Sequence, residues 1–387
     1  MEIMLFAFVG FVVCGVCLPF LIEGGSRFGI VDQPNVRKVH SVATPIVGGI
    51  GVYASFALVS LFAPVEAVSV SLLAWIGLVV VIGVADDLFD ISYLVRIVVH
   101  TAIVFGILFT DKMAVVELGA LTGGDSVRLV GFTAFLFTAI AVIGAVNTIN
   151  MCDGIDGLLG FLCLISLAFI FWFSWQATEV ADSTGSSHRV TPTGIAILIG
   201  TLVAFLMFNC RFLWLNEART FMGDAGSTAI GFLLVYLLID YSQGTGAVIS
   251  PVVAGWIIGL PLLDGSGVII HRALSRRSPF APDRTHIHHL LMIGGLTVNQ
   301  TVCTLITAHT FMIGFAVLAF QVFGPTVEPY LFWFFVILVL CRILVAAHFE
   351  NQSSVSLEKP DTAAAAIVGV KDDKVSTNFR KTETTSG

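Results

Sequence analysis

Charge is scarce in this 387-residue sequence: Asp, Glu, Lys and Arg make up 12% of it, against about 25% in soluble globular domains. Eleven of the 45 charged residues follow Phe349, so the rest of the chain is poorer still. A soluble protein of this size could not cover its surface with so few charges. Hydrophobic residues make up 57%, and the mean hydropathy is +0.96. The composition excludes a soluble protein and predicts a polytopic membrane protein.

Other absences reduce the number of function classes that fit the sequence. Basic residues are not in excess, since the net charge is −7 and the pI about 5.7, so no nucleic-acid partner is expected. The seven cysteines form no paired framework. The sequence has no Walker A loop, Ser-His-Asp order, flavin or haem signature, and no internal repeat of the transporter kind. Glu2 stands where a signal peptide would be basic, so we interpret the N-terminus as a first membrane span.

What the sequence does contain is a series of apolar segments of about 20 residues, the length of a membrane-spanning helix. Eleven such segments lie near residues 3–22, 46–64, 68–85, 94–110, 129–146, 157–175, 193–209, 226–241, 247–269, 301–323 and 329–349. We therefore predict an all-α membrane domain over residues 1–350 with about 11 transmembrane helices. The polar segment 351–387 is predicted to be a disordered tail.

Basic residues are divided unequally between the loops that join these segments. The odd-numbered loops contain nine and the even-numbered loops three. The positive-inside rule then places the odd-numbered loops and the tail in the cytoplasm, and the N-terminus on the outer side.

Most of the remaining charge gathers on the predicted cytoplasmic side. Of the 34 charged residues that precede Glu350, 21 lie in segments 23–45, 86–96, 147–157, 209–226 and 264–300. Carboxylates at a membrane boundary are costly and usually have a partner or a function. We therefore expect these loops to share one active site. Asp240 and Glu328, at the outer ends of spans, are expected only to be solvated.

The first cluster is Asp86-Asp87-Leu-Phe-Asp90, which directly follows an apolar run. A solvated helix cap is one interpretation, because Asp commonly begins or ends a helix. Two like charges at the hydrocarbon edge also suit a bound cation or phosphate chemistry. Both interpretations stay open for this pair by itself.

The second cluster runs from Asn147 to Asp156 as Asn-Thr-Ile-Asn-Met-Cys-Asp-Gly-Ile-Asp. Its polar residues recur every three positions and so share one face of a helical turn. Asn and Asp supply the hard oxygen ligands that suit Mg²⁺ or Mn²⁺. The alternative is a glycine-weakened helix end with Asn caps.

The third cluster, Phe221-Met-Gly-Asp224-Ala-Gly-Ser227, places one carboxylate just before a predicted helix. A helix N-terminus binds phosphate, and an acid beside it can hold the accompanying metal ion. Such turns are common, so this signal depends on its position beside the other clusters.

The last cluster, Ser278 to His289, contains Asp-Arg-Thr-His-Ile-His-His. A zinc site is one interpretation of its histidines. No cysteine lies nearby, and Arg with His suits the binding of phosphate oxygens and sugar hydroxyls, so we prefer anion recognition. Together the clusters favour phosphoryl transfer, in which a metal ion neutralises a diphosphate and a carboxylate positions the nucleophile.

In these same stretches the sequence resembles the polyprenyl-phosphate N-acetylhexosamine-1-phosphate transferase superfamily, and the Ser278–His289 stretch is similar to its WecA branch. The resemblance also includes Val31–His40, Thr44–Gly49, Asp86–Ser92, Asn147–Leu158 and Phe221–Ser227. It implies transfer of GlcNAc-1-phosphate from UDP-GlcNAc to undecaprenyl phosphate, in a bacterial inner membrane and with Mg²⁺ or Mn²⁺. The products would be undecaprenyl-pyrophosphoryl-GlcNAc and UMP.

The resemblance also implies roles for individual residues. Asp224 matches the metal-binding aspartate, with Asn150 as a second ligand. The residues expected to act in catalysis are Asp86, Asp87, Asp153, Asp156 and His288. Those expected to bind the substrates are Lys38, Thr44, Arg96, Asn147, Asn216, Phe221, Arg284, His286 and His289.

Two alternatives for the function stay open. Another donor, such as UDP-GalNAc or UDP-MurNAc-pentapeptide, would use the same chemistry, and Thr44-Pro45 is similar to the peptidoglycan branch. A cation-coupled transporter would need polar groups along a pathway to both faces. The sequence is also compatible with a homodimer, and it leaves the downstream glycan, O-antigen or enterobacterial common antigen, undecided.

Overall fold

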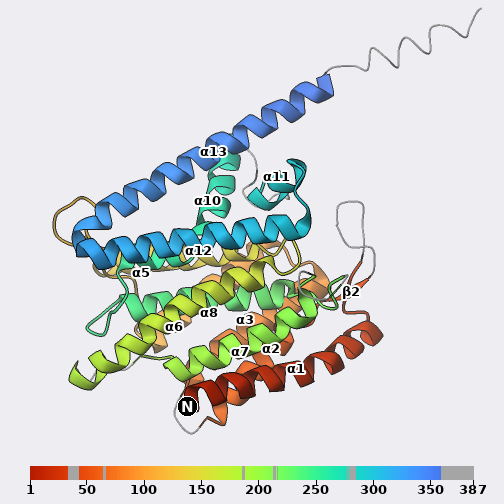
Figure 1. The fold of residues 1–387 in the computed structure, drawn as a ribbon, viewed down its shortest axis with the longest axis horizontal. Helices are drawn as coiled ribbons and strands as arrows, with labels where there is room; N and C mark the ends of the chain where they lie inside the picture. The colour runs from red at the N-terminus through yellow and green to blue at the C-terminus, as the bar shows by residue number, and fades with distance from the viewer. Residues whose placement is uncertain are drawn as a thin grey trace, which may run out of the picture.

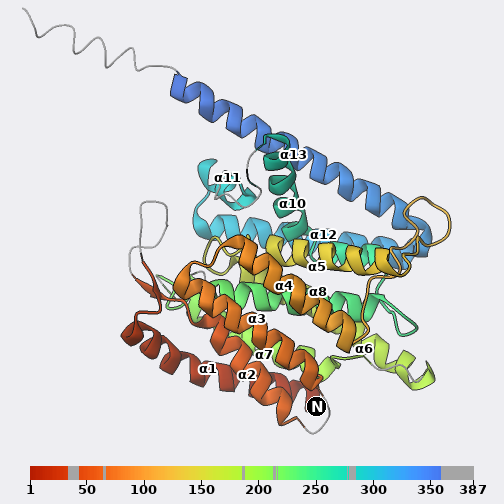
Figure 2. The same cartoon turned by 180° about the vertical axis from the view of Figure 1, so that it is seen from behind.

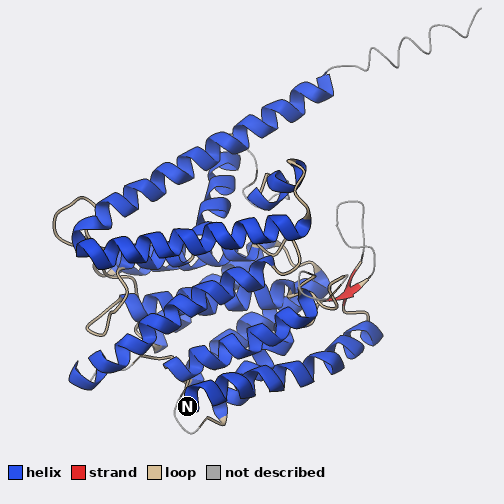
Figure 3. Cartoon of the chain, viewed as in Figure 1, coloured by secondary structure: helices blue, strands red, loops and turns tan. Residues whose placement is uncertain are grey.

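The computed structural model describes residues 1–33, 43–63, 67–184, 188–211, 215, 217–276, 278 and 285–358, with side chains left out at 179–184 and 350–358. This part of the chain is almost entirely helical (Figure 3). In chain order the elements are α1 (Glu2–Phe28), β1 (Val31–Asp32), β2 (Thr44–Pro45), α2 (Gly48–Leu61), α3 (Val70–Phe89), α4 (Tyr93–Thr110), α5 (Phe132–Asn150), α6 (Leu158–Thr184), α7 (Pro192–Asn209), α8 (Gly223–Ser242), α9 (Pro251–Ile257), α10 (Gly259–Leu274), α11 (Ile287–Ile293), α12 (Val298–Phe323), η1 (Gly324–Val327) and α13 (Glu328–Glu358).

Each apolar segment predicted from the sequence overlaps a helix or a pair of helices. In the described residues, eight helical stretches are long and apolar enough to cross a membrane, or nine if the bent pair α9 and α10 counts as one span. One of these stretches, Val298–Phe349, contains both α12 and α13, and the chain turns back between them at η1 (Figure 1). A polytopic membrane protein is therefore confirmed. The number of crossings and the side on which each terminus lies stay predictions.

The predicted span 247–269 is not one straight helix. Its two parts, α9 and α10, meet at an angle of 82°. Pro261 explains the break, because it has no N–H to bond to the carbonyl of Ile257 and its ring clashes with that carbonyl. The hydroxyl of Ser166 on α6 donates to this carbonyl instead, at 2.7 Å. The bend turns α10 across the bundle toward α13 (Figure 1).

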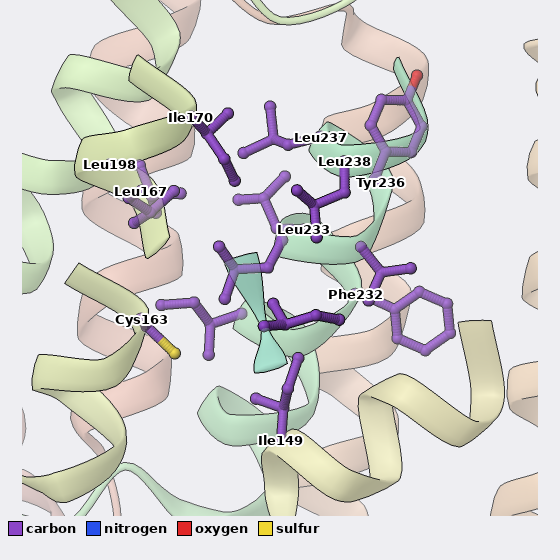
Figure 4. Close-up of a cluster of buried hydrophobic side chains, with 14 of the residues drawn as sticks. Ile149, Cys163, Leu167, Ile170, Leu198, Phe232, Leu233, Tyr236, Leu237 and Leu238 are labelled. Carbon is purple, nitrogen blue, oxygen red and sulfur yellow. The ribbon is translucent and has the colours of Figure 1, made fainter. Parts of the chain in front are cut away.

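Helix α8 is the centre of the bundle. It lies behind α6 in Figure 1 and behind α3 in Figure 2. In its apolar stretch 94% of the residues are buried, against 17% in α1. Figure 4 shows Phe232, Leu233 and Leu237 of α8 packed among side chains of neighbouring helices. Because α8 contacts protein on all sides, it is a rigid support for whatever its N-terminal end carries.

Glycines bring two helices against the N-terminal turns of α8. A Cβ on Gly49 of α2 would lie 2.2 Å from the Cα of Gly226, and one on Gly83 of α3 would lie 2.3 Å from the Cα of Ala225. Such close backbone approach is common where membrane helices pack through small residues. It places the C-terminal end of α3, which carries Asp86 and Asp87, directly beside the start of α8.

A short antiparallel hairpin, β1 and β2, lies at the same end of the bundle (Figure 1). The chain before α8 is tied to it, since the amide of Phe221 and the hydroxyl of Thr220 both donate to the carbonyl of Pro45 at 2.9 Å. Gly48 and Gly49 in turn donate to the carbonyls of Phe221 and Met222. These bonds fix the segment that leads into α8.

At the other end of the bundle, the expectation that Asp240 and Glu328 are merely solvated is wrong. Glu328 is 5% exposed and accepts hydrogen bonds from the hydroxyl of Ser250 at 2.6 Å and the amide of Ala120 at 2.5 Å. Asp240 accepts from the amide of Arg189 at 2.9 Å. Both carboxylates join loops to helix ends, which is a structural use of a buried charge.

Candidate active site

A cavity of about 580 Å³ opens at the end of the bundle that carries β2. Its polar lining side chains are Asp32, Asp87, Asn150, Asp153, Asp156, Asn209, Arg211, Asp224 and His289. All five of the charge-rich segments contribute at least one of its lining residues. This volume lies within the range of about 300–1,000 Å³ found for small-molecule sites. The cavity is the candidate active site.

Asp87 holds the N-terminus of α8. Its Oδ1 accepts from the amide of Asp224 at 2.9 Å, and its Oδ2 accepts from the amide of Ala225 at 3.2 Å. Gly223 has φ +71°, and a Cβ there would lie 2.7 Å from Oδ2 of Asp87, so only glycine admits this contact. The helix-cap interpretation therefore describes Asp87 well, although the helix that it caps is α8 and not its own.

Asp86 points elsewhere, although it is the next residue in the chain. It is 6% exposed and forms an ion pair with Nη1 of Arg96. The same Nη1 lies 3.3 Å from Oδ2 of Asp224. Arg96 thus bridges two carboxylates, and its side chain is 35% exposed.

Asn150 supports Asp224 from the other side. Its Nδ2 donates to Oδ1 of Asp224 at 2.8 Å and lies 2.7 Å from the hydroxyl oxygen of Ser227. The amide nitrogen, and not the amide oxygen, therefore faces the carboxylate. Direct metal ligation by Asn150 would require this amide to turn over.

The donor chemistry of the cavity fits Mg²⁺, although the described residues contain no group of three His, Cys, Asp or Glu side chains arranged to hold a metal ion. Mg²⁺ commonly takes one or two protein carboxylates and completes its shell with water and substrate phosphates, so three protein ligands are not required. Asp224 and Asp87 lie on the cavity wall beside each other and offer such carboxylates.

The loop between α5 and α6 supplies two more carboxylates. Asp156 pairs with Nε of Arg211, and the loop is held by the side chain of Asn209, which accepts from the amide of Gly157 at 2.8 Å. Among the described residues no cation pairs with Asp153, whose exposed surface faces the cavity. Its partial removal from bulk water inside the cavity, and then the negative charges of Asp224 and Asp156, raise the pKa of Asp153 to about 7.

The three histidines of the last cluster have different positions. His289 lines the cavity, whereas His288 is 3% exposed and packs against Gly154, where a Cβ would lie 2.3 Å from its Nε2. Burial, and then the neighbouring His289 and His286, lower the pKa of His288 to about 3, so its ring is neutral at physiological pH. His286 lies further from the cavity and donates from Nδ1 to Asp264 at 3.0 Å.

The remaining predicted residues are dispersed. Phe221 lines the cavity, Thr44 is buried in β2, and Asn147 borders a cavity of about 20 Å³ beside Arg96. Lys38, Asn216 and Arg284 lie outside the described residues.

Sequence reasoning missed Asp264 and Arg342, which form a buried ion pair behind the histidines. A signal was available for both, because each is a lone charge within a predicted span, at 247–269 and 329–349. Arg211 was counted only for orientation, yet it is the partner of Asp156 in the cavity wall.

Comparison with known proteins identifies the class. The profile of glycosyl transferase family 4 matches residues 69–242. Relatives that are 36% identical over 78% of this chain show that the chain belongs to this family. It is therefore a multi-pass membrane transferase of the glycosyl or phosphosugar kind.

Similar proteins include the undecaprenyl-phosphate alpha-N-acetylglucosaminyl 1-phosphate transferase of Escherichia coli (strain K12), 36% identical over 310 residues, or 78% of this chain and 79% of that protein. The protein of the same name from Yersinia pestis is 36% identical over 291 residues, 74% of this chain and 77% of that protein. The one from Haemophilus influenzae is 33% identical over 309 residues, 77% and 81% respectively.

Proposed function

We propose that this protein transfers GlcNAc-1-phosphate from UDP-GlcNAc to undecaprenyl phosphate and releases UMP. The observation that carries the proposal is the convergence of Asp87, Asp153, Asp156 and Asp224 with Arg211 and His289 on one cavity. Carboxylates beside cationic and imidazole groups suit the handling of a metal-bound diphosphate. The activity for which the similar proteins are named supports the choice of sugar and lipid.

In the proposed reaction the chain's own residues orient the reacting groups. Arg96 and Arg211 offer their guanidinium groups to phosphate oxygens, each from an existing ion pair that holds it in place. Asp87 fixes the first turn of α8 and so the position of Asp224. Asp153, with its pKa near neutrality, can accept a proton from the monophosphate of the lipid, whose second pKa is about 6.

A divalent cation is part of the proposal. Mg²⁺, or Mn²⁺ in its place, would be held by Asp224 and would neutralise the diphosphate charge as the bond to UMP breaks. Asn150, with its amide nitrogen on Asp224, would hold that carboxylate in orientation. Removing divalent cations with EDTA should therefore abolish turnover, and either ion should restore it.

The proposed setting is the inner membrane of a bacterium, with the cavity on the cytoplasmic face where UDP-sugars are made. The nine basic residues of the odd-numbered loops support this orientation. The product would begin a glycan of the O-antigen or enterobacterial common antigen type.

The direct test uses purified protein with UDP-GlcNAc, undecaprenyl phosphate and Mg²⁺, and measures UMP release together with the lipid-linked sugar product. Parallel reactions with UDP-GalNAc and UDP-MurNAc-pentapeptide test the donor. We expect turnover with UDP-GlcNAc and a much lower kcat/KM with the others. Turnover confined to another UDP-sugar, or absent with every UDP-sugar in folded protein, would overturn the proposal.

A further inference from the structure

A buried ion pair lies behind the histidines and does not reach the cavity. Asp264 of α10 is 4% exposed and Arg342 of α13 is 5% exposed. Nε and Nη2 of Arg342 donate to Oδ1 of Asp264 at 3.0 and 2.8 Å. Two charges so fully removed from water lose much of their hydration, and an apolar pair of similar size would often be as stable. The free-energy cost of burying these two charges therefore needs a further explanation.

The ion pair grips the chain that leads into α11. Arg342 Nη2 donates to the carbonyl of Thr285. Asp264 accepts from the amide of Ile287 at 3.0 Å and from Nδ1 of His286 at 3.0 Å. Carbonyl, side chain and amide of three successive residues are thus fixed by two side chains from two other helices. Because Asp264 is an acceptor only, Nδ1 of His286 carries the proton.

From His286 the contacts continue toward the cavity. Its ring is stacked on that of His288, with centroids 5.7 Å apart and planes at 10°, and the ring of His288 lies 4.2 Å from that of His289. His289 lines the cavity, and His288 also packs against Gly154 of the loop that carries Asp153. A shift of residues 285–287 would therefore be passed to two walls of the cavity.

We propose that Asp264 and Arg342 are positioning residues, a clamp that sets His289 and the loop between α5 and α6 against the nucleotide sugar. The claim about substrate rests on the proposed function, whereas the claim about the clamp does not. Misplacement of binding groups by about 1 Å can cost on the order of 10²-fold in rate. We expect kcat/KM for UDP-GlcNAc to fall by about this factor when the clamp is removed, with KM for the lipid acceptor unchanged.

The test removes both charges at once, because removing one would leave the other buried without a partner and could prevent folding. The double variant Asp264→Leu with Arg342→Met should insert and melt near the wild-type temperature. Hydrogen exchange of the peptide that contains Ile287 should be faster by about 10- to 100-fold, the factor expected for a lost bond to a charged group. Arg342→Lys should give an intermediate rate and kcat/KM, since an ammonium lacks the guanidinium fork.

A matched control changes another buried carboxylate, together with the hydroxyl that donates to it, at the opposite end of the bundle. Glu328→Gln with Ser250→Ala should leave both α11 exchange and donor kcat/KM at wild-type values.

Hydrogen exchange is measured without substrate and so does not depend on the proposed function. Wild-type exchange in the clamp variant overturns the clamp, and faster exchange with unchanged donor kcat/KM overturns its positioning role. If wild-type protein turns over no UDP-sugar, the proposed function fails, and the clamp is judged by exchange and by the reactivity of His289 toward diethyl pyrocarbonate.

Discussion

The two ends of the helical bundle both carry several carboxylates, but they use them differently. At the end that carries β2, Asp87, Asp153, Asp156 and Asp224 line one cavity of about 580 Å³. At the other end, Asp111 is 4% exposed and accepts from Tyr236 at 2.7 Å, Thr110 at 3.0 Å and Ser71 at 3.2 Å. The cavity that Tyr236 borders there has about 20 Å³, room for no more than a water molecule.

The difference shows what distinguishes an acid that is a candidate for catalysis from a structural one in a membrane protein. An acid at the membrane boundary is not by itself a sign of function, because both ends contain several. The sign is that several acids from separate loops line one cavity. A carboxylate surrounded by hydroxyl donors, such as Asp111, is fully occupied in holding helices together. Replacing one acid at a time therefore distinguishes the two kinds.

The largest effect is expected at Asp224. Replacing it with Ala should lower kcat by about 10³-fold or more, because a metal ion supplies several kcal/mol of charge stabilisation. UMP release measures the loss, and a melting curve in detergent checks folding. In Asp224→Cys, activity should be better with Mn²⁺ than with Mg²⁺, since a thiolate prefers the softer ion. Asp125→Ala, in an exposed loop at the opposite end, is the control and should have wild-type kcat. Normal turnover by Asp224→Ala would remove the metal assignment.

A smaller effect, on stability alone, is expected at Asp111. In Asp111→Asn the hydroxyls of Tyr236, Thr110 and Ser71 lose a charged acceptor, which should cost about 1.5–3 kcal/mol. The midpoint of thermal or denaturant unfolding should fall, while kcat per folded molecule stays unchanged. Tyr236→Phe removes one of the same bonds and should lower the midpoint less. Loss of activity without loss of stability would mean that this end of the bundle also takes part in the reaction.

The apolar segments and the one-sided gathering of charge could be predicted from the sequence because both depend on composition along the chain. So could the meeting of Asp87, Asp153, Asp156 and Asp224, since each lies at the end of a predicted span on the same side. The distinct positions of Asp86 and Asp87 could not be predicted from the sequence. Consecutive helical residues point about 100° apart. The packing of α3 against α8 at Gly83 decides whether Asp86 or Asp87 contacts Arg96. This packing belongs to the tertiary structure.

The bend in the predicted span 247–269 was visible in the sequence as Pro261, yet its consequence was not. The bend carries Asp264 on α10 toward Arg342 on α13, two charges 78 residues apart in the chain. Neither charge belongs to a motif, and each is the single charged residue of its predicted span. A lone charge inside a predicted span therefore indicates a buried partner, just as a cluster of charges does.

The smallest effect, and the one that most directly separates the two ends, is expected at Asp153. Its folded-state pKa of about 7 lies above the unfolded value of about 3.9, so ionisation costs the folded protein stability as pH rises from about 4 through 7. In EDTA at pH 8, Asp153→Asn should therefore melt higher than wild type, by only about 1–3 °C because Asp153 is exposed to the cavity and solvent screens its charge. The difference should shrink below pH 7 and vanish near pH 4, where both side chains are neutral. Turnover with Mg²⁺ should fall in the same variant.

At the other end, Asp111→Asn should lower the melting temperature at pH 8. A lower melting temperature for Asp153→Asn at pH 8 would place Asp153 with Asp111 among the structural acids.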